Sequence, residues 1–430
     1  MYILYSLLLA LALLASLPWW VVQLLRLGKY RAGLKERLGL VPARLARGSQ
    51  YGSIWIHAVS VGEVLAISHL LEELQKANPK TKIYVSTTTA TGQRLARDRF
   101  GEDRVFFMPL DFRFALRAYL DCLRPRLLIL AEAEFWPNLL HYAKRREVAI
   151  AIVNARVSDR SFPRYRRFRW FFSRILSEVD LFLAQTKDDA QRLRALGAPA
   201  QRVQVSGNLK FDVRSASGSS LVEAIRRDGG ENRHIIVCGS TTEGEEELLL
   251  EAFRSVLQQF PTATLILAPR HPERFDRVAS MVAASAITMI RRSRWASGSR
   301  ISGGVFLLDS VGELAALYEL ADVAFVGGSL LPGVGGHNIL EPAQHGVPIL
   351  VGPNTYNFRE IVRLFERNGA ITTVTPGNLA GVLLQFLEDE EECRRFGQRA
   401  RESFLQNAGA TARTLAALQP LLRERPAHVP

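Results

Sequence analysis

Two carboxylates stand where an apolar segment meets a helical one in the first half of the chain. Glu63 follows the apolar run 53–58 in the sequence HAVSVGEV, and Glu132 closes an apolar run in the sequence AEAEFWPN. A carboxylate at such a junction can act as a general base toward a hydroxyl group. It can equally be a structural residue that interacts only with the dipole of the following helix. For Glu63, the residue type leaves both interpretations open.

Glu132, Glu134 and Lys210 add further charged groups to the same half of the chain. Glu132 and Glu134 lie two apart and would share one face if the strand continued through them. Burying two carboxylates is costly unless a cation pairs with them, so one of them could form a structural ion pair with an arginine. The functional alternative is that Glu132 holds a substrate or tunes the neighbouring base. Lys210, in SGNLKFD, could neutralise a substrate carboxylate or a leaving phosphate, although a single loop lysine means little alone.

In the second half, residues suited to phosphate and nucleoside groups follow the apolar runs. Arg270 and His271 come directly after one run and precede Pro272. Arginine can bind a phosphate through two hydrogen bonds, and the amides at a helix start add further donors. The turn in LLDSVGEL offers backbone amides to the edge of a base. These amides belong to Val311, Gly312 and Glu313.

A glycine-rich segment, VGGSLLPGVGGHNILEPAQHGVPILVGP, covers residues 326–353. Its glycines can form tight turns, or they can let the backbone approach a ligand closely. A helix beginning near Asn338 would direct its free amides at a phosphate. Glu341, one turn into that helix, could bind a ribose diol as acidic residues do in nucleotide sites.

The elements that must position these residues alternate regularly. Short β-branched runs recur between amphipathic stretches, which is typical of a parallel sheet with crossover helices. A polar interval, RSASGSS at 214–220, interrupts the pattern, which then restarts. The sequence therefore predicts an α/β protein with two doubly wound, Rossmann-like domains, and the cleft between them is the expected site. This arrangement is common among glycosyltransferases that use activated sugars, and it also occurs in nucleotide-sugar epimerases. The predicted limits are 27–214, a linker at 215–220, and 221–430, whose last helix could cross back to the first domain.

Several motifs are absent from the sequence. It has no Walker lysine motif and no Gly-x-Gly-x-x-Gly after the first run, which argues against ATP hydrolysis and NAD chemistry. It has no Asp-x-Asp pair and no His-x-x-x-His spacing, so we expect chemistry without a metal. The three cysteines, Cys122, Cys238 and Cys393, lie far apart and predict neither a disulfide framework nor a zinc site.

The first 25 residues carry no charged side chain and are long enough to cross a hydrocarbon core of about 30 Å. The basic residues that follow are Arg26, Lys29, Arg31, Lys35 and Arg37. Because positive charge lies only behind the apolar segment, residues 1–26 are predicted to be a membrane anchor rather than a signal peptide. The positive-inside rule then places the remaining chain on the cytoplasmic side. A helix on the membrane surface is the alternative, which Pro18 favours.

The formal charge of +13 predicts an anionic partner, either nucleic acid, a membrane surface or a phosphorylated substrate. Arginines alternate with aromatic residues in RYRRFRWFFSR at 164–174. Such a pattern can bind single-stranded nucleic acid. Because of the apolar N-terminal segment, we favour anionic lipids or a phosphorylated lipid and expect no nucleic acid.

Five motifs together carry a resemblance to a known family. HAVSVGEV, AEAEFWPN, GNLKFD, APRHPERF and the glycine-rich segment 326–353 resemble, in order over nearly the whole chain, the lipid A 3-deoxy-D-manno-octulosonic acid (Kdo) transferases. The resemblance implies a glycosyltransferase of the GT-B type, with the acceptor bound by the first domain and CMP-Kdo by the second. It implies inverting transfer without a metal or other cofactor, onto a tetraacylated lipid A precursor at the cytoplasmic face of the inner membrane.

The same resemblance implies roles for single residues. Glu63 is the base, and Glu132 and Lys210 assist the transition state. The implied CMP-binding residues are Arg270, His271, Val311, Gly312, Glu313, Asn338, Ile339, Leu340 and Glu341. The family pattern has Glu-Thr-Glu where this chain has Glu132, Ala133 and Glu134, so both carboxylates remain but any hydrogen bond that depends on that hydroxyl cannot form here. The alternatives are another GT-B enzyme such as a nucleotide-sugar epimerase, and a membrane-tethered nucleic-acid-binding protein.

Overall fold

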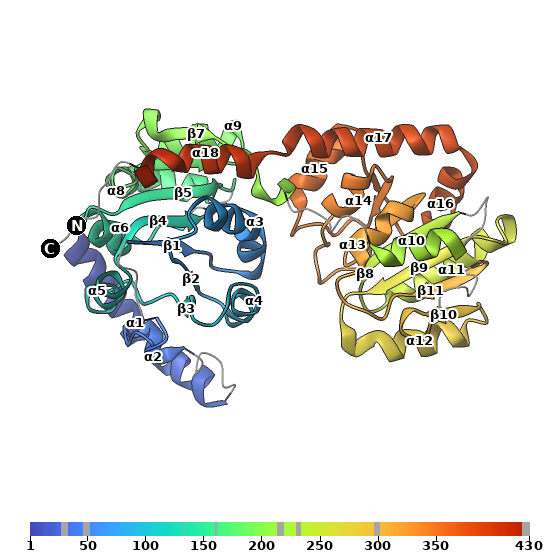
Figure 1. The fold of residues 1–430 in the computed structure, drawn as a ribbon, viewed down its shortest axis with the longest axis horizontal. Coiled ribbons are helices and arrows are strands. Elements are labelled where there is room, and N and C mark those ends of the chain that lie inside the picture. The colour runs from blue at the N-terminus through green and yellow to red at the C-terminus, as the bar shows by residue number, and fades with distance from the viewer. Residues whose placement is uncertain are drawn as a thin grey trace. The chain divides into compact units, whose positions relative to one another are not determined.

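The computed structural model describes residues 1–26, 33–45, 52–132, 134–159, 161–212, 219–228, 234–295 and 302–423, with the side chains of 19–26 excepted. The chain divides into two compact units (Figure 1). Unit 1 comprises Met1–Val213 and Ala408–Pro430, and unit 2 comprises Arg214–Asn407. Of the predicted linker, residues 215–218 lie outside the described residues, and helix α10 (Ser220–Asp228) begins at its end.

Unit 1 contains a parallel sheet with the strand order β3-β2-β1-β4-β5-β6-β7. Its strands are β1 (Ser53–His57), β2 (Ile83–Thr87), β3 (Val105–Phe107), β4 (Pro125–Ala131), β5 (Ala149–Ala155), β6 (Leu181–Ala184) and β7 (Val203–Val205). These strands coincide with the apolar runs SIWIHA, KIYVSTT, RVFFMPL, LLILAEA, VAIAIVNA, LFLAQT and RVQVSG of the sequence, so the prediction of a parallel sheet is confirmed. The chain builds outward from β1 to β3 and then returns to β4, which places the topological switch point between β1 and β4. Ligands of doubly wound sheets bind at this point, beyond the carboxyl ends of the strands.

Helices cover both faces of this sheet, each face with its own buried apolar cluster. They are α2 (Leu34–Arg37), α3 (Val61–Ala77), α4 (Ala90–Phe100), α5 (Arg113–Leu123), α6 (Pro137–Lys144), α7 (Phe162–Arg167), α8 (Arg169–Leu176) and α9 (Lys187–Leu196). Hydroxyl side chains at the strand-to-helix turns cap α3, α4 and α9 by accepting a backbone amide hydrogen bond. Such caps satisfy amides that have no partner inside the helix, which explains why the helices begin where they do.

The last helix, α18 (Ala410–Arg423), belongs to unit 1 (Figure 1). It packs on α3 and on the 3-10 turn η2 (Leu209–Asp212). The carboxylate of Asp212 accepts hydrogen bonds from the amides of Gly409, at 2.6 Å, and of Thr411. Residues far apart in the sequence therefore share one apolar cluster with α3, to which α18 contributes buried Leu418 and Leu422.

Unit 2 has a second parallel sheet, in the order β10-β11-β9-β8-β12-β13-β14. Its strands are β8 (Ile235–Thr241), β9 (Thr264–Pro269), β10 (Met289–Arg291), β11 (Gly304–Leu307), β12 (Val323–Val326), β13 (Ile349–Val351) and β14 (Thr372–Thr373). The apolar runs HIIVCGS, ATLILAPR, GVFLLDS, VAFVGGS, VPILVGP and AITTVT predict six of these strands, and β10 is an additional one. The switch point of this sheet lies between β8 and β12. The helices of the unit are α10, α11 (Glu245–Gln259), α12 (Phe275–Ala284), α13 (Leu314–Leu317), α14 (Leu340–His345), α15 (Arg359–Arg367), α16 (Leu379–Glu388) and α17 (Glu390–Asn407).

The N-terminal helix α1 (Tyr2–Arg26) is attached to unit 1 near its beginning. The Tyr2 ring stacks on His141 with 3.9 Å between centroids, and its hydroxyl donates to Glu178 at 3.1 Å. Asn138 Nδ2 donates to Ser6 Oγ at 2.9 Å. In the part of the chain that the structure describes, no helix is both long and apolar enough to span a membrane. The predicted anchor at 1–26 therefore stays a prediction.

Candidate active site

Glu63 lies at the carboxyl edge of the first sheet, in the first turn of α3. Ser60 caps this helix, and its Oγ accepts a hydrogen bond from Glu63 N at 3.5 Å. The Glu63 carboxylate accepts hydrogen bonds from Val59 N at 2.7 Å and from Ser60 Oγ at 3.0 Å. This reciprocal arrangement is a variant of the capping box, in which the carboxylate binds the amide of Val59, one residue before the cap, instead of the amide of Ser60 itself. The structural interpretation of Glu63 is therefore correct for its local geometry, and a catalytic role must rest on something more.

The surroundings of Glu63 supply that additional observation. Glu63 is only 9% exposed to solvent. Burial, with smaller effects from the charges of Glu132 and Glu134, raises the pKa of its carboxyl from 4.5 to about 7, against the lowering effect of its hydrogen bonds to Val59 and Ser60. A general base is most effective when its pKa lies near the operating pH. The capping box thus fixes in place a carboxylate whose pKa suits proton transfer.

The raised pKa of Glu63 predicts two pH dependences of opposite sign. If its carboxylate is the base, kcat/KM should rise about tenfold per pH unit up to about pH 7 and then level off. Stability should change the other way, because the folded state holds this proton more tightly than the unfolded state. The stabilisation from protonated Glu63 is complete below pH 4.5 and is lost as the pH rises to about 7. A pH–rate profile of the wild type measures the first dependence, and urea unfolding of wild type and E63Q at several pH values measures the second. A wild-type kcat/KM that is flat from pH 5 to 8 would contradict the predicted rate dependence.

Glu132 lies across the switch point from Glu63, because Glu63 follows β1 and Glu132 follows the adjacent β4. The strand ends at Ala131, and Glu132 has φ 59, in the left-handed region that is unfavourable for a non-glycine residue. The strand therefore does not continue through Glu134, and the condition for the two carboxylates to share a strand face is not met. They remain electrostatic neighbours, since burial and then the charge of Glu132 raise the pKa of Glu134. Ala133 lies outside the described residues.

Lys210 lies in η2, which packs on the helix that carries Glu63. Asn154, a fully buried residue of β5 with φ 53, accepts a hydrogen bond from Leu209 N at 3.0 Å through Oδ1. Asn208 Oδ1 accepts another from Lys210 N at 3.0 Å. The backbone of η2 is thereby fixed at the carboxyl edge of the sheet. Unit 1 brings all three predicted catalytic residues, Glu63, Glu132 and Lys210, to this one edge.

In unit 2, the residues predicted to bind phosphate and ribose are also neighbours. Arg270 follows β9 with an exposed side chain, and its charge acts on Glu341 and on His337. Burial raises the pKa of Glu341, opposed by the hydrogen bond from Asn338 Nδ2 to Glu341 Oε1 at 3.1 Å and by Arg270. Burial, and then the charges of Arg270 and His271, lower the pKa of His337 to about 4. His337 is therefore neutral at pH 7, whereas the exposed guanidinium of Arg270 can attract an anion.

Ile339 and Leu340 differ from the other predicted residues, because both side chains belong to the core. They are 1% and 4% exposed. Only their backbone could contact a ligand. The helix α14 starts at Leu340, close to the predicted start near Asn338.

The predicted base-reading turn follows β11, the sheet neighbour of β9. Val311 is 79% exposed, and Gly312 has φ 93. The Glu313 carboxylate is occupied by an ion pair with Arg292, at 2.9 Å, and by a hydrogen bond from Ser310 Oγ. Within the described part of unit 2, this turn makes no direct hydrogen bond to the Arg270 or Glu341 side chains. Its backbone amides remain the part of it that could read a base.

A metal centre receives no support from the arrangement of side chains. Among the described residues, no group of three or more His, Cys, Asp or Glu side chains could hold a metal ion. The three cysteines are free.

Comparisons with known proteins match both halves of the chain. A family model described as 3-Deoxy-D-manno-octulosonic-acid transferase (kdotransferase) matches residues 32–213, and one described as Glycosyl transferases group 1 matches 227–403. The 3-deoxy-D-manno-octulosonic acid transferase of Haemophilus influenzae is 35% identical over 399 residues, which cover 92% of each chain. The chain belongs to the 3-deoxy-D-manno-octulosonic acid transferase family. The Bordetella pertussis transferase is likewise 35% identical, over 96% of this chain and 98% of its own.

The fold of this Kdo transferase is shared more widely. The crystal structure of UDP-GlcNAc 2-epimerase from Neisseria meningitidis has a TM-score of 0.55 and covers 86% of this chain and 100% of its own, at 13% identity. At that identity the likeness shows the fold alone. It supports the prediction of two Rossmann-like domains and gives no support to epimerase activity.

Sequence reasoning missed some residues that position the site of this transferase. Asn154 closes the apolar run AIAIVNA in the way that Glu132 closes its own run, and this signal could have identified it. Glu245 was missed because it stands in a run of three glutamates, GEEE, which is typical of a solvated first helical turn. The structure instead buries Glu245 completely.

Proposed function

We propose that this enzyme transfers Kdo from CMP-Kdo to a tetraacyl lipid A precursor, by a metal-independent inverting displacement in which Glu63 is the general base. The observation that carries the proposal is the fixed, buried Glu63 carboxylate, with a pKa raised to about 7, beside two further carboxylates at a switch point. The identity of the sugar follows from membership of the family. The acceptor, the donor nucleotide and the stereochemistry rest on the resemblance of the motifs.

In this mechanism one bond forms as another breaks. An acceptor hydroxyl oxygen attacks the anomeric carbon of Kdo, its proton passes to Glu63, and the bond from that carbon to the phosphate oxygen of CMP breaks. CMP departs as an anion with the bonding electron pair, so no covalent intermediate and no second nucleophile are needed. Glu132 and Lys210 assist as neighbours of the base, Lys210 by opposing negative charge on the sugar carboxylate or the phosphate.

The donor is assigned to unit 2. The exposed guanidinium of Arg270, with His271, suits the phosphate of CMP. Glu341, held by Asn338, suits the ribose diol. The amides of Val311, Gly312 and Glu313 suit the cytosine edge. Displacement requires that the acceptor hydroxyl bound by unit 1 reach the anomeric carbon bound by unit 2.

The assay that tests the proposal uses the full chain in detergent with CMP-Kdo, a tetraacyl lipid A precursor and excess chelator. We expect CMP release together with an increase of one or more Kdo masses in the acceptor. UDP-GlcNAc in place of CMP-Kdo serves as the control donor and should give no turnover. Absence of transfer from CMP-Kdo would refute the assignment of substrates, and transfer abolished by the chelator would refute the metal-independent route.

We also propose that unit 1 binds anionic lipid at the cytoplasmic face of the inner membrane. The outer side of α1 presents an apolar stripe, in which Ile3, Leu7, Leu11 and Leu14 are each more than half exposed. The neighbouring helix α8 adds an exposed Trp170. The two helices are in contact where the Tyr5 ring of α1 lies near the Phe171 ring of α8, with 6.4 Å between the ring centroids. The helices α7 and α8 also carry arginines in their last turns. An apolar stripe with flanking cations suits an anionic membrane surface.

Replacing Leu7 and Leu11 together with Asp should reduce binding to phosphatidylglycerol vesicles about tenfold or more. Both side chains are exposed, so their replacement removes apolar area available to lipid without opening the core. Vesicle co-sedimentation measures the effect. Leu405→Asp, at an exposed leucine of unit 2, is the matched control and should bind as wild type does. Equal binding of all three proteins would contradict this lipid contact.

A further inference from the structure

The glycine-rich segment begins with backbone amides that converge on one buried carboxylate. Glu245 Oε2 accepts a hydrogen bond from Gly328 N at 2.7 Å, and Glu245 Oε1 accepts from Ser329 N at 3.0 Å and Leu330 N at 2.9 Å. Thr242 adds its own amide at 2.9 Å and its hydroxyl at 3.0 Å, both to Oε2. Consecutive amides of this kind form an anion-binding concavity. Here the anion belongs to the protein itself.

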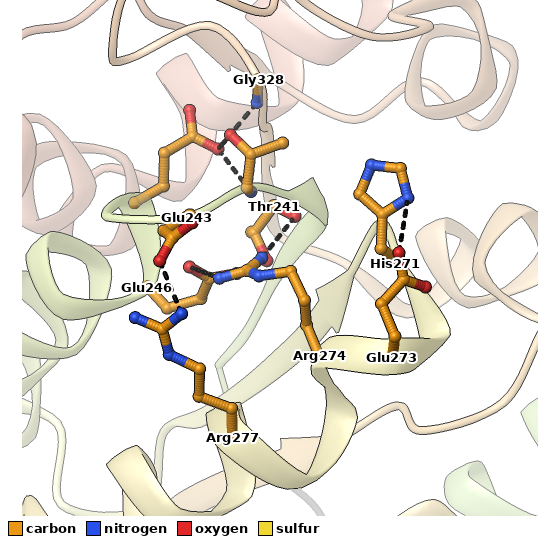
Figure 2. Close-up of polar contacts among 10 residues, drawn as sticks. Thr241, Glu243, Glu246, His271, Glu273, Arg274, Arg277 and Gly328 are labelled. Carbon is orange, nitrogen blue, oxygen red and sulfur yellow. Dashed lines mark hydrogen bonds and ion pairs between the residues drawn. The ribbon is translucent and has the colours of Figure 1, made fainter. Parts of the chain in front are cut away.

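No cation shares the charge of Glu245 among the described residues of unit 2, although Glu245 is 0% exposed. The next residue behaves differently. Glu246 accepts from Arg274 at 2.7 and 2.9 Å and from Thr241 Oγ1 at 2.9 Å (Figure 2). Figure 2 also shows Gly328 donating toward a carboxylate above this pair. Glu246 therefore forms an ordinary buried ion pair, whereas the charge of Glu245 is balanced by backbone dipoles.

The contact between Glu245 and the amides of Gly328–Leu330 lies at the switch point of the second sheet. Glu245 begins α11 after β8, and the amides that it binds follow β12. These two strands flank the switch point, where doubly wound sheets usually bind their ligand. The carboxylate thus joins the two loops that would otherwise enclose a ligand phosphate.

The glycines of the segment fit this internal contact. A Cβ on Gly327 would lie 2.6 Å from Ser240 O and 2.9 Å from Glu245 Oε2, and Gly328 has φ 69. The protein's own packing therefore requires these two glycines, which favours the tight-turn alternative over a close approach to a ligand at positions 327 and 328. The effect continues along the segment, because Gly328 O accepts from Gly336 N at 2.6 Å, two residues before Asn338.

We propose that Glu245 is a positioning residue: its carboxylate occupies the amide concavity at Gly328–Leu330 in place of a substrate phosphate and fixes the loop that leads to Asn338 and Glu341. The donor phosphate then binds outside this concavity, on the side of Arg270. The proposal rests on the proposed function in assigning the donor to unit 2.

Amide hydrogen exchange of the wild-type chain, with and without CMP, tests the occupancy. The amides of Gly328–Leu330 should be protected without CMP and unchanged by it, whereas those of 338–341 should gain protection. Exchange-labile amides at 328–330 that become protected by CMP would overturn the proposal, because the concavity would then belong to the donor. If CMP changes nothing anywhere, the donor assignment fails, while the protection at 328–330 still measures the role of Glu245.

Glu245→Gln tests the positioning role, since its amide group places donors against donors. We expect faster exchange confined to 328–341 and CMP binding weaker by about tenfold or more, with the pH–rate profile of transfer unchanged. Glu243→Gln is the matched control, because Glu243 is exposed and pairs with Arg277 at 2.6 Å (Figure 2). Unchanged CMP affinity in E245Q, or faster exchange spread evenly over unit 2, would overturn the proposal. If E245Q does not fold, the wild-type exchange experiment still decides whether Glu245 or the donor phosphate occupies the concavity.

Discussion

Replacing Glu63 with glutamine should lower the rate of Kdo transfer by about 10²- to 10⁴-fold and leave CMP binding unchanged. Glutamine can close a capping box in the same way as glutamate, so α3 should keep its start at Ser60. The amide cannot accept the proton of the acceptor hydroxyl. The substitution thus separates the catalytic interpretation of Glu63 from the structural one, which Glu63→Ala would not do. Initial rates of CMP release and calorimetric titration with CMP measure the two quantities.

The chain offers a matched control for this experiment in α9. Asp189 makes the same set of contacts as Glu63: its amide donates to the capping Thr186 at 3.1 Å, and its carboxylate accepts from Thr186 Oγ1 at 2.6 Å and from Val157 N at 2.9 Å. It also stands at the carboxyl edge of the first sheet. Asp189→Asn should therefore destabilise the fold slightly and leave the rate per folded molecule intact. Equal losses of rate in E63Q and D189N would assign Glu63 to helix capping alone.

Replacing Glu341 with alanine should weaken CMP binding by roughly 10- to 100-fold, the effect of losing charge-assisted hydrogen bonds to a diol. Glu341 is held by Asn338 Nδ2 at 3.1 Å, so its carboxylate is oriented before the ligand arrives. The comparison of CMP with its 2′,3′-dideoxy analogue locates the interaction. Wild type should prefer CMP strongly, and E341A should bind both alike.

Glu319→Ala controls for a general loss of negative charge in unit 2, since Glu319 forms a largely exposed ion pair with Arg226. It should bind CMP as wild type does. If E341A still prefers CMP over the dideoxy analogue as strongly as wild type, Glu341 is a structural residue of α14.

Most of the fold could be predicted because its signals are local. Apolar runs such as 53–58 and 323–329 alternate with amphipathic stretches, and this pattern is enough to predict two parallel sheets. Strand β10 escaped prediction because its three residues are followed by a run of arginines, and its pairing with β11 depends on tertiary contacts. The conformation of Glu132 could not be predicted either, since a positive φ at a non-glycine residue leaves no mark in the sequence.

The sequence selects candidate residues for the site, but it does not predict their pKa values or their hydrogen-bond partners. Glu63 is a candidate base because of its place after a strand, whereas the pKa of about 7 that supports this proposed role depends on burial and on the charges of Glu132 and Glu134. Likewise, the glycines at 327 and 328 signal a close approach of backbone to something. Only the structure shows that the close neighbours are Ser240, Thr241 and Glu245 for Gly327, and His337 and Val334 for Gly328.

Unit 1 cannot fold completely during synthesis until the end of the chain has been made, because its helix α18 follows unit 2 in the sequence. A ribosome releases the strands of the first sheet, then all of unit 2, and only afterwards the residues 410–423 that form α18. Until then the buried surface that α18 covers on α3 and η2 is open, and Asp212 lacks the amides of Gly409 and Thr411. The segment that carries Lys210 therefore reaches its final surroundings last, and a nascent chain cannot finish unit 1 before all residues of unit 2 have been made.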